Sequence, residues 1–177
     1  MFTKIVENRS VRDKDARDTA KIVGLAAIKY GDLSNQATKD YIFDVDRFTS
    51  FEGNTGPYIL YTIVRIKSIL NRYVEAGGNL EAGEILPASN GSEKNLMLQL
   101  SGFGSMIESA FEEKAPHKIC AYIYEVSNAF NSFYHETKIL SEENQAQKES
   151  YIRLLQLTKR VLETSIDLLG FEAPDKM

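Results

Sequence analysis

The 177-residue sequence contains a single cysteine, Cys120, and only two histidines, His117 and His135. A lone cysteine excludes an intramolecular disulfide and a zinc site built from several cysteines. A zinc site that used both histidines would also need carboxylates whose positions the sequence does not reveal. Asp44 and Asp46 lie close together, but the further oxygen ligands of a calcium loop are missing around them. We therefore expect no metal site.

Long apolar runs are missing as well. No segment approaches the roughly 18 apolar residues that a membrane-spanning helix needs. The opening MFTKIVENRS places polar and charged residues before any apolar stretch long enough for a signal peptide. We therefore expect a cytoplasmic protein without a membrane partner. The net charge of −4 argues against a general polyanion binder, because nonspecific affinity needs many contacts between cations and phosphates. Any nucleic acid must be bound by a local surface.

Apolar residues recur at intervals of three and four along most of the chain, which predicts an all-α helical bundle. Length alone allows one domain, or one domain with an appendage. The segment at 40–48 reads as irregular structure packed on the helix before it. The expected helices are 13–30 ended by Gly31, a stretch from Ser34, 57–76, 92–111 capped by Ser92, a helix after Pro116, and 145–169 ended by Gly170.

The helix at 57–76 has two contrasting faces, and its sequence from Asn54 to Val74 contains no acid. Aromatic and basic side chains together favour a surface that stacks bases and pairs with phosphates. The loop before it, FEGNTGPY, has two glycines that permit positive φ and a proline suited to a first helical turn, so its shape should be fixed. The expected core arc is Leu60, Ile63, Ile66, Leu70 and Val74, and the opposite face carries Tyr58, Tyr61, Arg65 and Arg72.

Four segments in this order resemble the C-terminal, anticodon-binding (DALR-type) region of bacterial arginyl-tRNA synthetase: ENRSVRDKDARDTAKIVGLAAIKYGDLSN, DYIFDVDRFTSFEGNTGPYILYTIVR, AFNSFYHETKIL and LLGFEAPDKM. The resemblance covers nearly the whole chain and is weakest at 75–92. It implies an anticodon-binding helical bundle at 51–177. Residues 1–50 would then be the helical end of the catalytic region, close to the tRNA stem.

The resemblance also implies that tRNA(Arg) is the partner and that an anticodon with a central cytosine is preferred. The loop at 51–56 would hold its backbone in a fixed shape, and the tyrosines would stack on bases. Arg65 would pair with a phosphate or a base, and Met177 would line the base pocket. In FNSFYH, Phe130 and Phe133 should be core, and Asn131 could bond between helices. The implied anticodon-binding residues are Phe51, Glu52, Gly53, Asn54, Thr55, Gly56, Tyr58, Tyr61, Arg65, Tyr134 and Met177.

The sequence departs from the usual family pattern at Leu60 and Ile63, where the family carries glutamine and histidine. Both positions point toward the expected core, so these departures leave the aromatic and basic face of the helix unchanged. The larger departure is the absence of the HIGH-like and KMSKS-like motifs that bind ATP in class I synthetases. We therefore expect this chain to be a catalytically inactive, excised or truncated piece of an arginine–tRNA ligase. ATP and Mg would belong to the full-length enzyme, and no cofactor to this piece.

Two interpretations of function remain open at this stage. In the first, the chain recognises tRNA(Arg), its other partner is the missing N-terminal catalytic region, and DNA has no part. In the second, the chain is a freestanding helical module that binds a protein helix through apolar grooves and does not bind RNA. The acidic net charge favours the second. The aromatic and basic face, together with the resemblance, favours the first.

Overall fold

The computed structural model describes residues 13–177, with side chains from residue 16, and all regular structure in that part of the chain is helical. This confirms the predicted all-α class. No helix within these residues is both long and apolar enough to cross a membrane. The helices are α2 (Asp13–Leu33), α3 (Val45–Phe48), α4 (Gly56–Glu75), α5 (Gly91–Ser101), α6 (Phe103–Glu112), α7 (Pro116–Glu136) and α8 (Gln145–Leu168).

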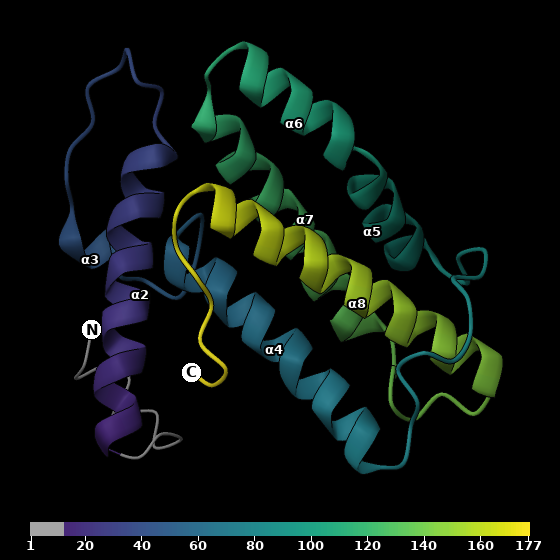
Figure 1. Ribbon diagram of the computed structural model, residues 1–177. Coiled ribbons are helices and arrows are strands. Elements are labelled where there is room, and N and C mark those ends of the chain that lie inside the picture. The colour runs from purple at the N-terminus through teal and green to yellow at the C-terminus, as the bar shows by residue number, and fades with distance from the viewer. Residues whose placement is uncertain (1–12) are drawn as a thin grey trace.

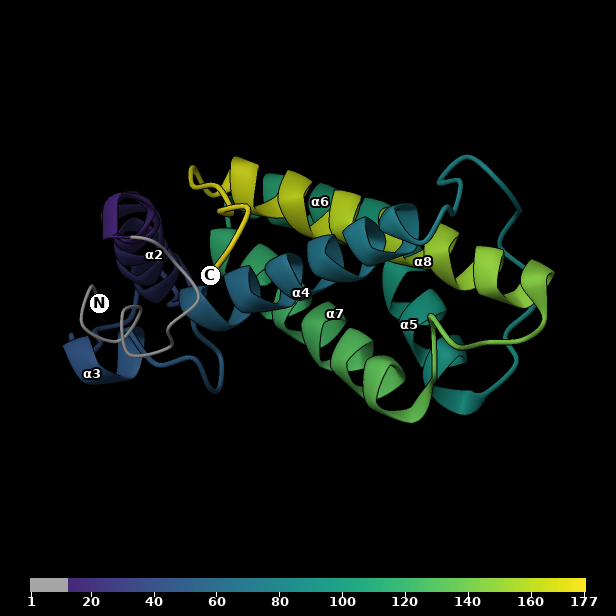
Figure 2. The same ribbon diagram turned by 90° about the horizontal axis from the view of Figure 1, so that it is seen from below.

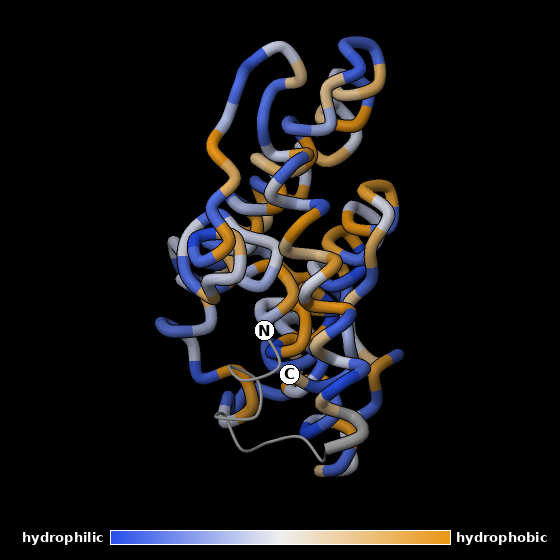
Figure 3. The backbone as a smooth tube through the Cα atoms, turned by 90° about the vertical axis from the view of Figure 1, so that its left-hand side faces the viewer, coloured by the Kyte–Doolittle hydropathy of each residue, from blue (hydrophilic) through white to orange (hydrophobic). Residues whose placement is uncertain are grey.

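The helices α4, α7 and α8 pack together at the centre of the molecule (Figures 1 and 2). The helices α5 and α6 pack against α7, and α2 packs against α4 with α3 beside it. Hydrophobic and hydrophilic residues alternate along these helices (Figure 3), as expected when each helix buries one stripe. Residues of α2 belong to the same core as the central helices, among them Val23 and Tyr30, which are fully buried.

The first predicted helix boundary is wrong. Helix α2 continues through Gly31 to Leu33, and Gly31 is not among the glycines with positive φ. Its missing side chain makes room for a ring, because a Cβ built there would lie 2.5 Å from Cδ2 of Phe48. The helical stretch expected from Ser34 is also wrong, since only turns and coil follow until α3. The irregular structure expected at 40–48 is confirmed for residues 40–44 only, because residues 45–48 form α3, whose buried Phe48 anchors the segment.

The helix predicted at 92–111 is two helices, α5 and α6, with a break at Gly102. Its cap is Asn90 and not Ser92, because Oδ1 of Asn90 accepts a hydrogen bond from the backbone N–H of Glu93 at 2.8 Å. Because of the break, α6 does not continue the buried stripe that the periodicity predicted for one long helix. Phe111, expected to be apolar core, is consequently 83% exposed.

Helix α4 follows the predicted wheel except in its last turn. Leu60, Ile63 and Ile66 are fully buried and Leu70 is 7% exposed, whereas Val74 is 48% exposed. The wheel predicted that neighbouring helices would cover Val74, but they do not. Helix α8 ends as predicted, at Gly170 with φ of +79°, where the backbone N–H groups of Gly170 and Phe171 bond back to the carbonyls of Asp167 and Ile166.

Candidate nucleic-acid interface

The loop between α3 and α4 is held at its last residue before the helix. Thr55 caps α4, since its Oγ1 accepts from the backbone N–H of Tyr58 at 3.3 Å, and the same hydroxyl donates to the carbonyl of Ser50 at 2.7 Å. Gly53 has φ of +78°, which a side chain would strain. These contacts give the loop the defined shape that its two glycines and Pro57 predicted.

Gly56, the first residue of α4, lies directly against the backbone of α2. A Cβ at this position would be 2.4 Å from the carbonyl oxygen of Ala26 and 2.7 Å from its carbonyl carbon. Contact at this distance is possible only without a side chain. The glycine therefore sets how closely α2 and α4 approach, in addition to shaping the loop.

Tyr30 links the loop to two helices. Its hydroxyl, on α2, lies 2.5 Å from Oδ1 of Asn54 in the loop and 2.8 Å from the carbonyl oxygen of Cys120 in α7, and it can donate to either. Burial raises the pKa of Tyr30 well above its usual range, so the hydroxyl keeps its proton. Periodicity placed Tyr30 on the core face of its helix, but no local pattern indicated its link to Asn54.

Tyr58 is half-buried and bonded between helices, not free on an open face. Its hydroxyl donates to Oδ1 of Asn128 at 2.8 Å and accepts from Nδ2 of Asn131 at 2.9 Å, both on α7. Its ring meets that of Tyr124 edge-on, with centroids 5.7 Å apart. Desolvation raises the pKa of Tyr58 despite the opposing bond from Asn131, so the hydroxyl remains a donor at neutral pH. Tyr58, which the wheel placed on the open face of α4, therefore joins α4 to α7, and its stacking role stays a prediction.

Three side chains that the sequence singled out separately come together on the surface of α4 and α7. The guanidinium carbon of Arg65 lies 4.7 Å from the ring centroid of Tyr61 and 5.1 Å from that of Tyr134. The two tyrosines are 40% and 37% exposed. We call Tyr61, Arg65 and Tyr134 the aromatic–arginine cluster. It places one guanidinium over two partly exposed tyrosine rings on one surface.

Asn131 of α7 holds Arg65 in place within this cluster. Its Oδ1 accepts a hydrogen bond from Nη1 of Arg65 at 2.7 Å, while its amide group bonds Tyr58. Phe130 and Phe133 on either side are fully buried, which confirms the predicted core positions. The prediction that Asn131 bonds between helices is also confirmed. An amide that accepts from a guanidinium fixes its plane without neutralising its charge, so Arg65 keeps its full charge for an anion.

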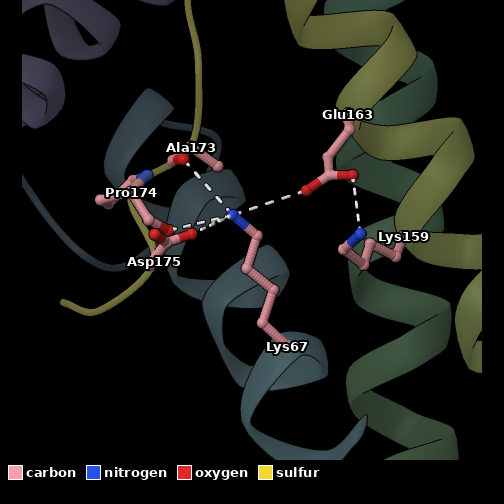
Figure 4. A network of polar contacts seen from close by, with 6 residues as sticks. All are labelled: Lys67, Lys159, Glu163, Ala173, Pro174 and Asp175. Carbon is pink, nitrogen blue, oxygen red and sulfur yellow. Dashed lines mark hydrogen bonds and ion pairs between the residues drawn. The ribbon is translucent and has the colours of Figure 1, made fainter. Parts of the chain in front are cut away.

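The C-terminal tail folds back onto the bundle, as Figure 4 shows around Lys67 of α4. The ammonium of Lys67 lies 3.4 Å from the carbonyl oxygen of Ala173, 3.3 Å from that of Pro174 and 3.3 Å from Oδ1 of Asp175. Glu163 of α8 is 3.6 Å from the same ammonium. The tail is therefore anchored at the middle of α4 through one cation.

Apolar contacts complete this docking. Phe171 and Pro174 are buried, and Met177 is partly buried against the core. Phe171 therefore docks the tail against the core. The role of Met177 in a base pocket stays a prediction. Sequence reasoning missed the role of Lys67 in holding the tail, because the pattern showed it only as a break in the apolar arc of α4.

The other predicted loop residues lie at the surface beside Thr55. Phe51 is half-buried, whereas Glu52 and Gly53 are exposed. The backbone N–H of Glu52 donates to Oγ of Ser50 at 3.1 Å. Taken with the cluster, the surface offers stacking faces, a guanidinium and a rigid loop. Within residues 13–177, no three histidine, cysteine or acidic side chains gather as metal ligands would.

Comparison with known proteins places this surface in a family context. The model of the DALR anticodon binding domain family matches residues 59–177. The arginine–tRNA ligase of Agathobacter rectalis is 68% identical over 173 residues, which is 97% of this chain and 29% of the relative. That of Alkaliphilus oremlandii is 52% identical over 177 residues, covering 100% of this chain and 30% of the relative.

Solved structures agree with the sequence matches. The arginyl-tRNA synthetase of Thermus thermophilus aligns with a TM-score of 0.86 at 29% identity, over 97% of this chain and 29% of that one. The Plasmodium falciparum enzyme aligns with a TM-score of 0.81 at 30% identity, over 92% and 28%. The chain thus spans about 29% of the length of the curated relatives that it matches. By its sequence and its helical fold, the chain belongs to the DALR anticodon binding domain family.

Proposed function

We propose that this chain binds the anticodon loop of tRNA(Arg), as the C-terminal part of an arginine–tRNA ligase. The observation that carries the proposal is the aromatic–arginine cluster, in which Asn131 holds Arg65 against two exposed tyrosines. Unpaired bases stack on aromatic and guanidinium planes, and a charged guanidinium pairs with phosphate. The names of the relatives support the same assignment.

The roles of the surface residues follow from their positions. Tyr61 and Tyr134 stack on splayed bases, and Arg65 pairs with a phosphate or a base edge. Tyr58 supports the cluster through Asn131, and its half-buried ring stacks beside it. The loop at 51–56 supplies a fixed backbone for the anticodon loop to rest on. Met177 lines the pocket of the central anticodon base, for which cytosine is the preferred occupant.

The catalytic region of the ligase is the second partner that we propose. Helix α2, the segment before α3 and the first residue of α3 expose several large apolar side chains, and a surface of this kind marks a contact with another protein segment. ATP, Mg and the arginylation reaction belong to that region, so this chain alone should be inactive. The cytoplasm is the proposed location, and DNA is not a partner. The exposed apolar residues are Leu25, Ile28, Ile42, Phe43 and Val45.

The predicted domain boundary near residue 50 stays a prediction. Residues 1–12 of the proposed catalytic remnant lie outside the described residues. Within the described part, α2 shares one core with the bundle through Val23 and Tyr30. We therefore propose that α2 stays attached to the bundle when the catalytic region is absent.

Replacing Tyr134 with alanine should weaken binding of a tRNA(Arg) anticodon stem-loop by about 1–3 kcal/mol, the usual cost of losing one base stack. The side chain is 37% exposed and its ring stacks on Phe130, so the melting temperature should fall only slightly. Fluorescence anisotropy with the labelled stem-loop measures the affinity, and circular dichroism measures the melting.

Phe111→Ala is the matched control, because Phe111 is an exposed aromatic on α6, outside the cluster. It should leave both quantities unchanged. Equal affinity of Tyr134→Ala and the unaltered chain would show that the ring does not stack on RNA. Failure of the unaltered chain to distinguish the cognate stem-loop from one with a changed central base would instead favour the protein-interaction module.

Removal of Lys176 and Met177 should reduce discrimination for the central cytosine more than it reduces total RNA affinity. The phosphate contacts of Arg65 would survive, whereas the base pocket would lose one wall. The Lys67 contacts to residues 173–175 remain, so the tail should stay docked. Anisotropy with the cognate and altered stem-loops gives both numbers. Unchanged discrimination would make Met177 a bystander.

A further inference from the structure

A second cationic pocket lies at the end of α4, away from the loop at 51–56. It has a volume of about 230 Å³ and forms where the last turn of α4 meets the first turn of α8. Arg72 and Lys148 supply its two cations, and Gln145 and Leu140 contribute further walls. None of the described residues that line it is acidic. A pocket lined by two cations and no anion favours an anionic occupant.

The two cations have no partner of their own. Three other basic side chains on these helices pair with an acid: Lys67 with Asp175, Lys159 with Glu163, and Arg153 with Glu81 at 3.8 Å. Arg160 of α8 has no such partner among residues 16–177, but it lies outside the pocket. Among residues 13–177, no ion pair or side-chain hydrogen bond engages Arg72 or Lys148. Two like charges that line one pocket repel each other, and an anion bound between them would relieve that repulsion.

The surrounding backbone suits an anion as well. Asn144 caps α8 by accepting from the N–H of Gln147 at 3.2 Å, and its own N–H donates to Oε1 of Glu142 at 3.0 Å. The N–H groups of Gln145 and Ala146, in the first turn of α8, have no intrahelical acceptors. That turn is the positive end of a 24-residue helix. Gly77, with φ of +86°, lines the opposite wall and presents no side chain. A group as small as a phosphate can therefore approach the backbone closely.

Arg72 is aligned with the aromatic–arginine cluster. It follows Arg65 by seven residues, which is two helical turns, so both lie on one face of α4 and about 10 Å apart along its axis. Leu140, on the pocket wall, follows the end of α7, which carries Tyr134 in its last turn. A few nucleotides of single-stranded RNA can span this separation. A strand that stacks in the cluster therefore reaches the pocket with its next phosphates.

We propose that Arg72 and Lys148 bind a backbone phosphate of the RNA whose bases occupy the aromatic–arginine cluster. This inference rests on the proposed function and extends its surface along α4. A phosphate contact adds affinity without reading sequence, so it positions the strand and leaves base discrimination to the cluster.

The test is a salt titration of stem-loop binding with the 177-residue chain. Arg72→Ala and Lys148→Ala should each weaken binding several-fold, equally for the cognate stem-loop and for one with a changed central base. Each should reduce the slope of log affinity against log salt by about 0.7, the value for one contact with a single strand, and the double variant by about twice that. Arg160→Ala and Lys94→Ala, at exposed cations outside the pocket, are the matched controls. They should change neither quantity.

The outcomes separate this inference from the proposed function. If the unaltered chain binds and discriminates the stem-loops but both pocket variants keep its salt slope, the pocket is not an RNA site. If inorganic phosphate alone shifts the amide resonances of Gln145 and Gly77 while the salt slope stays unchanged in the variants, the pocket holds a free anion, and the proposal is overturned. If the unaltered chain does not bind the stem-loop, both proposals fall together.

Discussion

Replacing Asn131 with alanine should lower both stability and RNA affinity, because this amide serves two networks. Loss of its side chain leaves the half-buried Tyr58 hydroxyl without its donor and the Arg65 guanidinium without its acceptor. Leaving such groups unpaired costs about 1–3 kcal/mol of unfolding free energy. Arg65 is then free to leave its place between Tyr61 and Tyr134, and stem-loop affinity should fall by a comparable amount. Urea denaturation and fluorescence anisotropy measure the two effects.

Asn128→Ala is the matched control for this prediction. It removes the other partner of the Tyr58 hydroxyl but touches no atom of Arg65. Stability should therefore fall while stem-loop affinity stays close to that of the unaltered chain. If both asparagine variants lose affinity to the same extent, the general loosening of α4 against α7 explains the loss. Asn131 would then have no positioning role.

Gly56→Ala is the second change with a large expected effect. The added methyl group would meet the carbonyl of Ala26 at 2.4 Å, and a backbone atom cannot rotate away as a side chain can. Helices α2 and α4 must separate, so the unfolding free energy should fall by about 1–3 kcal/mol, the usual range for overpacking. The loop at 51–56 would move with the start of α4, so RNA binding should weaken as well.

Two other glycines serve as controls for this variant. Gly91→Ala adds a methyl group in open space at the first turn of α5 and should be neutral or slightly stabilising. Gly53→Ala also meets open space, but its φ of +78° should cost about 1–2 kcal/mol. A stable Gly56→Ala variant with full RNA affinity would show that the two helices can separate without consequence.

Sequence periodicity predicted most of the helices because each buries one stripe against the same core. It was wrong where a signal had two physical meanings. Glycine can end a helix by adopting positive φ. At position 31, the small residue instead makes room for the ring of Phe48. Likewise, Ser92 and Asn90 are both good caps, and only the three-dimensional course of the chain decides between them.

The candidate site was predictable in its residues but less so in its connections. The helical wheel placed Tyr58 opposite the core, but helix α7 partly covers Tyr58. The position of α7 depends on long-range packing that no local pattern contains. Asn131 was expected to bond between helices, and the structure identifies its partners as Tyr58 and Arg65. That the surface binds an anticodon loop stays a prediction, and the pocket at Arg72 and Lys148 joins residues 76 positions apart.

The link from Tyr30 to Asn54 joins the loop to α2, so a change in the loop on ligand binding would be felt at α2. If the catalytic region alters the position of α2, the hydroxyl of Tyr30 moves, and the geometry of the loop changes with it. Thermodynamic linkage then requires reciprocity: whatever factor the catalytic region applies to anticodon affinity, the bound anticodon applies to the affinity for the catalytic region. A single phenolic hydroxyl, whose one proton can go to Asn54 or to the carbonyl of Cys120, would thus make the proposed anticodon binding and enzyme assembly mutually dependent events.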